Sequence, residues 1–467
     1  MQIPILNGIY TDEVSDFRTS YPRNLIPVPK QQGISKGYLR PANGIAQAGT
    51  GPGVDRGGIN WNGACYRVMG SKLVRIHTDN TYFELGDVGG STTPVRFDYS
   101  FDRLGIASDL KLFYWDGVTL TEVTDPDLGP VIDMLWTDGY FMTTDGANLI
   151  VTELTDPTLV DPLKYGSSEE DPDPVVALVM LREEVYAVNR NTIQVFDNVG
   201  GDAFPFAPIK GATIPKGAVG TRAVVVFAEA LAFVGSGRNE APAVYAGLNS
   251  QTKKLSTREI DQQLLNYTEL QLSRVLVEVQ VDKNHENLLI HLPDQTLVYD
   301  GLASAAVEEP VWYTLTSSVV GLGQYRARNL VWCYDRWLCG DPTTSKYGYY
   351  TDEVSTHYGE VNGWDFGTLI VYNDGMGAVI HELELVALPG RVQFGLDPVI
   401  WTSYSADGET WSQERAVRAG KQGQRNQRIH WLGNGAMRNW RIQRFRGTTD
   451  AHLSMARLEA RIEALNV

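Results

Sequence analysis

The sequence predicts an all-β protein, a β-propeller of six to eight blades followed by a C-terminal antiparallel β-sandwich. Short apolar hairpins recur along about two-thirds of the chain. Their starts fall roughly 35 to 60 residues apart, near the ~40–50 residues of a four-stranded propeller blade. After about residue 354 this period is lost, although strand patterns continue. We therefore expect an extended arm at 1–54, the propeller at 55–354 and the sandwich at 355–467.

The clearest hairpin is NHENLLIHLPDQTLVYDG, at 284–301. An apolar run reaches a Pro293-Asp294-Gln295 turn, where Pro presets φ and Asp can bond its own backbone. Branched and aromatic residues in both arms favour a pleated surface. Similar hairpins are expected at 61–79, 101–117, 137–154, 181–198, 227–247 and 334–352.

A two-stranded hairpin is marginal by itself in water, so each copy needs further strands. Short apolar segments at 175–180, 223–228 and 275–281 could complete the blades. Radial stacking of such blades buries both faces of each sheet.

The first fifty or so residues contain Pro22, Pro27, Pro29 and Pro41 and no sustained period. Because proline removes ladder donors and restricts the residue before it, this segment is expected to wrap or link. Order in such an arm comes from packing on its own body or on a neighbour.

Helix signals are poor in the repeat region. The best is 256–267, where Ser256 could cap and Ile260, Leu264 and Leu265 share a face. The acidic stretch 155–174 lacks the ligand pattern of an EF-hand calcium loop and is expected to be a solvated surface loop.

The C-terminal region reads as a set of antiparallel strands. Asp407-Gly408 is a natural two-residue hairpin turn. In MARLEARIEAL apolar and charged residues alternate, which indicates a closing strand even though the residues are good helix formers. The expected strands are 379–388, 399–405, 426–433, 439–447 and 455–465.

Composition excludes several classes of function. The net charge of −16 argues against a sequence-reading nucleic-acid binder. No apolar run approaches the ~18 residues that span a bilayer, and no secretion signal is evident at the N-terminus. Three cysteines, Cys65, Cys333 and Cys339, are too few for a disulfide framework. Cys333 and Cys339 could face each other across a hairpin, but buried free thiols in a reducing compartment are expected.

No catalytic, metal or cofactor residue can be nominated. The seven histidines form no HExxH motif, and His291 suits a satisfied core position. SADGETW, at 405–411, is one residue short of the "Asp box" of sialidases and lies outside the repeats. A tight hairpin with an aromatic anchor explains it more simply.

Basic and aromatic side chains interleave in the C-terminal region, where 401–467 carries eleven Lys and Arg against six Asp and Glu. Such interleaving can bind nucleic acid, but protein interfaces are also enriched in Trp and Arg. In a chain this acidic we expect docking against an acidic partner, which includes another copy of the chain. The candidate interface residues are Arg415, Arg418, Arg425, Arg428, Arg438, Arg441, Trp431 and Trp440.

Three pieces together resemble a known family. They are SYPRNLIPVPKQQGISKGYLRPANGI (20–45), the 284–301 hairpin, and the end of the chain from SADGETWSQERAV through RIHWLGNGAMRNWRIQRFRG. The combination is similar to the tail hub of short-tailed, lambdoid-type phages, known as the packaged-DNA stabilisation or tail accessory protein.

The resemblance implies a non-enzymatic virion tail protein, made in the host cytoplasm without membrane insertion or cofactor. About six copies would ring the tail axis below the portal and its adaptor, close the DNA exit, hold the needle or plug and mount the tailspikes, the receptor-binding proteins. Six copies at −16 each would carry −96, and such a lumen would let DNA slide without sequence-specific binding. The alternative is a glycan-active propeller, either a sialidase-like hydrolase or a lectin. A hydrolase is expected to place at least two carboxylates, together with arginines, at its central face.

Overall fold

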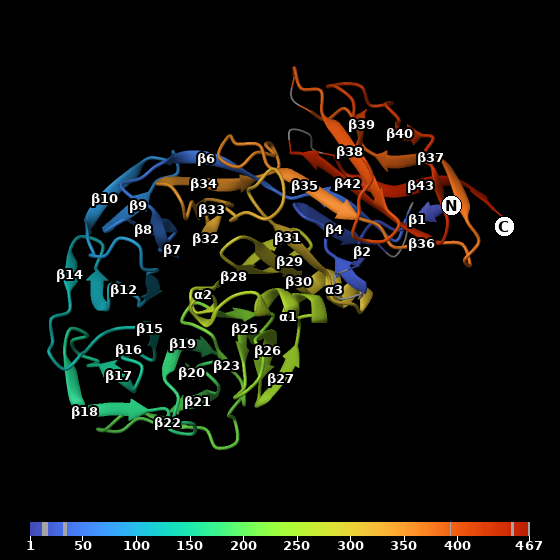
Figure 1. Cartoon of the computed structure of the whole chain (residues 1–467). Helices are drawn as coiled ribbons and strands as arrows, with labels where there is room; N and C mark the ends of the chain where they lie inside the picture. Colours follow the sequence, from blue (N-terminus) through green and yellow to red (C-terminus); the bar gives the residue numbers. More distant parts are fainter. Residues whose placement is uncertain (12–16, 31–34, 393, 450–452, 466–467) are drawn as a thin grey trace.

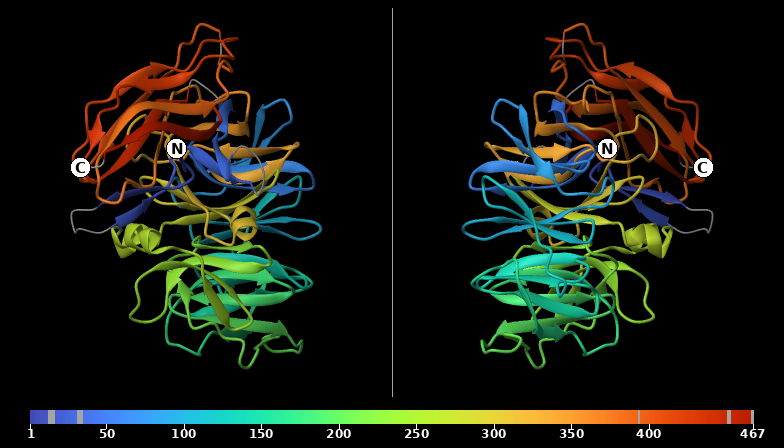
Figure 2. Two further views of the ribbon diagram at one scale, coloured as in Figure 1. Left: turned by 90° about the vertical axis from the view of Figure 1, so that its right-hand side faces the viewer. Right: turned by 90° about the vertical axis from the view of Figure 1, so that its left-hand side faces the viewer.

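The computed structural model describes residues 1–11, 17–30, 35–392, 394–449 and 453–465. A ring of sheets, coloured from blue to yellow-orange, lies beside an orange and red sandwich (Figure 1). The two side views place both termini at the sandwich end of the molecule (Figure 2). Within the described ranges, no helix is long and apolar enough to cross a membrane.

Seven sheets form the ring in the described part of the chain, which confirms the predicted propeller. The first three blades use consecutive strands, and each blade turns back on itself in antiparallel order. Their strands are β7 (Asp55–Trp61), β8 (Ala64–Met69), β9 (Lys72–Ile76), β10 (Tyr82–Asp87), β11 (Arg96–Tyr99), β12 (Leu104–Ser108), β13 (Lys111–Trp115), β14 (Leu120–Glu122), β15 (Asp133–Thr137), β16 (Tyr140–Thr144), β17 (Asn148–Thr152) and β18 (Val160–Ser167).

The fourth to sixth blades follow the same plan, with a split first strand in the fifth. Their strands are β19 (Val175–Leu181), β20 (Glu184–Asn189), β21 (Ile193–Asn198), β22 (Phe206–Pro208), β23 (Gly217–Ala218), β24 (Val224–Phe227), β25 (Ala230–Ser236), β26 (Ala243–Leu248), β27 (Gln251–Lys254), β28 (Leu276–Asp282), β29 (His285–His291), β30 (Thr296–Asp300) and β31 (Trp312–Leu315).

The predicted hairpins are the two middle strands of the blades. In the 284–301 copy, β29 and β30 pair from Asn287 with Asp300 to His291 with Thr296. The first strands β7, β11, β15, β19, β24, β28 and β32 contact one another around the axis. The apolar segments expected to complete the blades are therefore the inner strands β19, β24 and β28.

The ring closes through the N-terminal segment. Strand β6 (Gly44–Thr50) is the outer strand of the seventh blade, beside β34 (Lys346–Thr351), β33 (Arg336–Gly340) and β32 (Arg328–Cys333). A Cβ on Gly44 would lie 2.0 Å from the Val354 carbonyl oxygen, so only glycine fits this position. The first and last parts of the repeat region are thus joined by a backbone ladder.

The sandwich takes strands from both ends of the chain. One sheet runs β4-β5-β43-β37-β40, with β1 beside β43 and β41 beside β37; the other runs β35-β42-β38-β39, with β36 beside β42. The segment 1–54, where we expected an arm, thus contributes strands to both domains, and β2 and β3 form a separate hairpin. The strands are β1 (Gln2–Ile3), β2 (Gly8–Thr11), β3 (Phe17–Ser20), β4 (Leu25–Pro29), β5 (Gly37–Pro41), β35 (Gly363–Gly367), β36 (Val371–Tyr372), β37 (Ala378–Ala387), β38 (Val399–Ser405), β39 (Arg415–Arg418), β40 (Ile429–Leu432), β41 (Ala436–Met437), β42 (Trp440–Thr448) and β43 (Met455–Ala464).

The period-2 pattern at the end of the chain predicted its structure correctly. β43 is a strand that pairs with β37 along almost its whole length. Met455, Leu458 and Ala460 on this strand are buried. Helix propensity is overridden here because one apolar face of the strand packs into the sandwich core.

Three sequence expectations need correction. Helix α1 (Arg258–Leu265) begins after Thr257, and the Ser256 hydroxyl donates instead to Asp261 Oδ1 at 2.6 Å, so Ser256 is not its cap. The stretch 155–174 includes β18, which pairs with β17 as the outer strand of its blade. Residues 406–414 separate β38 from β39, so Asp407-Gly408 is not a two-residue hairpin.

Two further helices escaped the sequence pattern. They are α2 (Glu269–Leu272), which begins with a Thr268 capping box, and α3 (Gly301–Val307), which is capped by Asp300. Both are too short to show a helical period.

Two buried ionisable side chains of the propeller, His291 and Glu278, are paired with each other. The imidazole of His291 lies between Thr296 Oγ1 at 2.8 Å and Glu278 Oε2 at 3.0 Å, which confirms the expected core histidine. Glu278 also accepts from the backbone N–H groups of Asn329 and Leu330 in the next blade. All three cysteines are buried and free, as expected.

Candidate assembly interface

A dipeptide in the N-terminal segment joins the two domains. The Arg23 Nε donates to Asp365 Oδ2 in the sandwich at 2.6 Å. Its Nη atoms donate to Thr316 Oγ1 and to the carbonyls of Ser318 and Val319, which follow the last strand of the sixth blade. Only 6% of Arg23 is exposed, so solvent screens these contacts little.

Asn24 completes this link. Its side-chain Nδ2 donates to the Gly363 carbonyl at 2.6 Å, and its Oδ1 accepts from Thr316 N at 2.9 Å. Its own backbone N–H donates to the Thr314 carbonyl at 2.7 Å. Asn24 has φ of 54°, a left-handed conformation that asparagine tolerates better than most residues. Arg23 and Asn24 therefore hold the propeller and the sandwich in a defined arrangement.

The structure separates the eight candidate interface residues into two groups. Arg415, Arg418, Arg425, Arg428 and Arg438 are exposed and Trp440 is half-buried. Trp431 and Arg441 are buried, with 2% of each exposed.

Trp431 and Arg441 belong to the sandwich interior and cannot contact a partner of the folded chain. The Arg441 guanidinium lies 3.6 Å above the Tyr404 ring and donates to Gln443 Oε1 and the Asn434 carbonyl. Burial lowers the pKa of Arg441 to about 10. The alternation of β42 could have indicated this position, because Arg441 shares a strand face with the buried Phe445.

Three of the exposed arginines already have partners within the domain. Arg428 pairs with Glu382 and Glu384, and Arg418 lies 3.4 Å from Asp397. Arg415 donates to the carbonyls of Leu432 and Gly433. Exposed pairs of this kind contribute little to stability, so these side chains can exchange partners at low cost.

Arg425 and Arg438 differ from these three. Neither side chain makes a hydrogen bond or an ion pair among the described residues. Arg425 sits in a loop that bonds the facing loop through Gly423 N and the Gly390 carbonyl at 3.1 Å. Phe394 in that facing loop is 92% exposed. This end of the sandwich combines an uncompensated cation with a fully exposed aromatic ring, as protein interfaces commonly do.

The segment that resembles an Asp box belongs to the sandwich and not to a propeller blade. SADGETW lies in the sandwich, where Asp407 accepts from Glu409 N and Thr410 N in a local turn. No three His, Cys, Asp or Glu side chains among the described residues are grouped to hold a metal ion.

Comparison with known proteins covers both domains. A family model described as bacteriophage P22 Gp10, beta-propeller, matches residues 1–355, and one described as bacteriophage P22 Gp10, beta-sandwich, matches residues 363–463. The tail hub protein gp10 of Salmonella phage P22 is 26% identical over 483 aligned residues, which cover 99% of each chain.

Solved structures are more distant. The computationally designed Ika8 protein aligns with a TM-score of 0.40 and 10% identity, over 66% of this chain and 100% of its own. The N-terminal domain of Nup159 aligns with a TM-score of 0.41 and 8% identity, over 69% of this chain and 97% of its own.

Proposed function

Since the chain belongs to the bacteriophage P22 Gp10 family of tail hub proteins and is a component of the virion tail, we propose that it forms a ring of about six copies beneath the portal and adaptor. The ring closes the DNA exit channel, retains the packaged DNA, and mounts the tail needle and the tailspikes. The role is structural and non-enzymatic. The observation that carries the proposal is the match of both domains, in the same order, to the two parts of one tail hub family.

The contacts between the two domains support a mechanical role for the chain. A hub that holds pressurised DNA and carries tailspikes must transmit force between its contact surfaces without letting its domains separate. The buried Arg23 and Asn24 contacts provide such a link between the propeller and the sandwich. The β6–β34 ladder closes the propeller against opening at its seventh blade.

The exposed arginines supply a surface for neighbours in the ring. A closed ring of identical subunits uses a heterologous interface, in which two different patches meet. The rest of the chain is strongly acidic, whereas residues 401–467 are basic. We propose that Arg425 and Arg438 contact an acidic surface of the adjacent copy or the adaptor, because neither has an ion-pair partner among the described residues.

The net negative charge of the chain also bears on how DNA passes through the proposed ring. With −16 per copy, an acidic lumen would repel phosphate and keep the duplex from adhering to the wall. The chain would then guide DNA without reading its sequence.

A nonsense mutation in the gene of the phage that encodes this chain tests the proposal. The expected particles have a portal and adaptor but lack tailspikes, and their DNA becomes sensitive to nuclease after packaging. Supplying the wild-type chain in trans should restore DNA retention and spike attachment. Particles that keep their DNA and spikes without the chain would contradict the proposal.

A further inference from the structure

Arginines stand at the start of the inner strand in five of the seven blades described. The positions are at, or one or two residues to either side of, the first residue of β7, β11, β24, β28 and β32. Because inner strands surround the axis, these positions bring several cations to one end of the central channel. The residues are Arg56, Arg96, Arg222, Arg274 and Arg328.

Two of the five have structural roles. The Arg56 guanidinium donates to the carbonyls of Gly70, Gly89 and Thr93 at 2.6 to 2.8 Å. Arg328 donates to the Leu292 carbonyl at 3.0 Å. These contacts fix the loops between blades.

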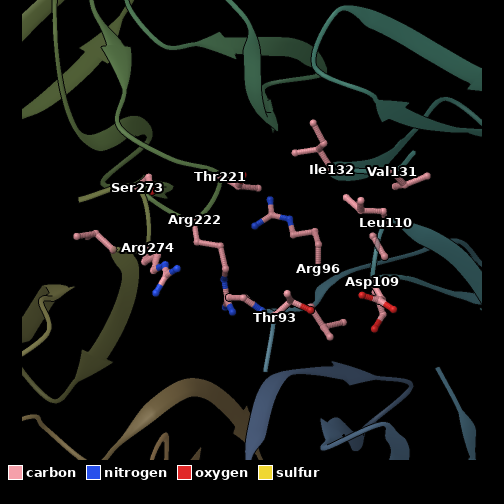
Figure 3. Close-up of a pocket in the computed structure, with 15 residues that line it drawn as sticks. Thr93, Arg96, Asp109, Leu110, Val131, Ile132, Thr221, Arg222, Ser273 and Arg274 are labelled. Atoms are coloured by element: carbon pink, nitrogen blue, oxygen red, sulfur yellow. The ribbon is translucent and has the colours of Figure 1, made fainter. Parts of the chain in front are cut away.

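The other three line one cavity of about 380 Å³. Arg96 comes from the second blade, Arg222 from the segment before β24 of the fifth, and Arg274 from the segment before β28 of the sixth. Figure 3 shows Arg96 reaching across this space from the side opposite Arg222 and Arg274. Asp109 is the one acidic side chain among the described lining residues. The lining therefore carries three positive charges against one negative charge.

The three arginines differ in the partners that the protein gives them. Arg222 donates to two neutral acceptors, Asn329 Oδ1 at 2.9 Å and the Arg56 carbonyl at 3.3 Å. Burial lowers the pKa of Arg222, whereas the nearby carboxylates of Glu278, Asp55 and Asp133 favour its charged form. Arg274 makes no side-chain hydrogen bond or ion pair with any described residue.

Among the described residues, Arg96 is the one member of the three that makes an ion pair. Its Nε lies 3.4 Å from the buried Asp133 Oδ1, while the other Asp133 oxygen accepts from Leu178 N at 2.8 Å. The Arg96 Nη2 also donates to the Leu178 carbonyl at 3.4 Å, so both contacts orient this side chain at the cavity wall.

The remaining lining suits a small organic anion. Hydroxyls of Thr93, Thr221 and Ser273 can bond additional oxygens, and the apolar side chains of Val95 and Ile132 can contact a carbon skeleton. Guanidinium groups bind carboxylate and phosphate in bidentate geometry. A partly apolar pocket with a few convergent polar groups is the usual form of a small-ligand site.

We propose that this cavity at the end of the propeller channel is an anion-binding site that takes the carboxylate or phosphate group of a small ligand. Arg222 and Arg274 bind the oxyanion together with Arg96. Asp109 restricts the site by repelling an additional negative charge. The proposal does not depend on the ring or on any other tail protein.

Isothermal titration of the purified full chain with citrate and with inorganic phosphate tests the site. The titrations are made at about 20 mM salt, because higher ionic strength screens partly exposed charges. Saturable binding of either anion at one site per chain supports the proposal, and the tighter of the two shows which oxyanion the cavity prefers. Absence of saturable binding for both anions would overturn it.

Three variants distinguish anion binding in the cavity from non-specific attraction of the anion to surface arginines. R274Q removes an exposed cation without breaking an internal bond and should weaken binding roughly tenfold, because hydrogen bonds to charged groups are strong. D109N removes the repelling charge and should tighten binding, an effect that simple loss of structure cannot produce. R182Q changes an exposed arginine outside the cavity and should leave binding unchanged. Equal weakening by R182Q and R274Q, or weaker binding by D109N, would contradict the assignment.

Discussion

Arg23 and Asp365 are 342 residues apart in the chain, yet the Arg23 Nε donates to Asp365 Oδ2 at 2.6 Å. This contact joins the segment before β4 to β35, where the chain leaves the propeller and enters the sandwich. The same guanidinium bonds carbonyls that follow the sixth blade. One buried side chain therefore contacts both domains.

We expect R23A to destabilise the protein by about 3 kcal/mol, because breaking a buried pair leaves the remaining charge uncompensated. Equilibrium unfolding in guanidinium chloride measures the change. R182A, at an exposed propeller arginine, is the control and should shift the midpoint little. An unchanged midpoint for R23A would show that the two domains are held by other contacts.

Asn24 gives a separate prediction, because its amide bonds and its backbone conformation can be tested separately. N24G and N24A both lose the contacts with Gly363 and Thr316, so both should lower the unfolding free energy. N24A should cost about 1 kcal/mol more, since alanine is strained at φ of 54° and glycine is not. Equal stability of N24G and N24A would mean that the backbone at position 24 leaves the left-handed region in the variants.

The buried His357 predicts a pH dependence of stability. Its Nδ1 lies 2.8 Å from Ser317 Oγ, and burial lowers its pKa from 6.5 to about 3. The unfolded chain therefore binds a proton more readily than the folded chain between these values. Stability should be full above pH 6.5 and should fall as the pH drops toward 3.

Within that window the contribution of one such histidine is about 1.4 kcal/mol per pH unit. Urea unfolding of the wild type and of H357Q at pH 7 and pH 5 measures it. H357Q should lose less stability than the wild type over this interval. Parallel losses in the two proteins would show that His357 is protonated in the folded state.

The proposed contact surface predicts that charge reversal separates folding from assembly. The double variant R425E/R438E should keep its unfolding midpoint, because neither side chain has a partner among the described residues. Its binding to portal–adaptor complexes or to other copies should fall at least tenfold, since like charges now face an acidic partner. K210E, at an exposed propeller lysine, is the matched control. Retained assembly by R425E/R438E would place the contact elsewhere.

Local patterns predicted most of the blades and the strands of the sandwich. Turn residues such as Asp145 and Gly146 lie between β16 and β17, and alternation identified β43. Such signals depend only on residues that are close in sequence, so they can be recognised without knowledge of the fold. The same reasoning missed α3, because Asp300 ends a strand and caps the helix at once.

The candidate site was less predictable, because its contacts are long-range. The segment 20–45, which contains Arg23, is one of the pieces that resemble the family. The partners of Arg23, Thr316 and Asp365, lie about 300 residues away in sequence. The convergence of Arg96, Arg222 and Arg274 likewise depends on three separate blades. Arg222 and Arg274 each lie two residues before an apolar inner strand, which is a signal that the sequence does contain, whereas β11, which begins at Arg96, reads RFDY and gives no such signal.

The mass of the purified native protein, measured by light scattering with and without purified portal–adaptor complex, tests the central claim most directly. The account predicts either a preformed ring of about six copies or a monomer that becomes such a ring on the complex. A stable monomer that does not bind the complex would contradict the proposed tail hub assembly and direct attention to glycan binding by the propeller.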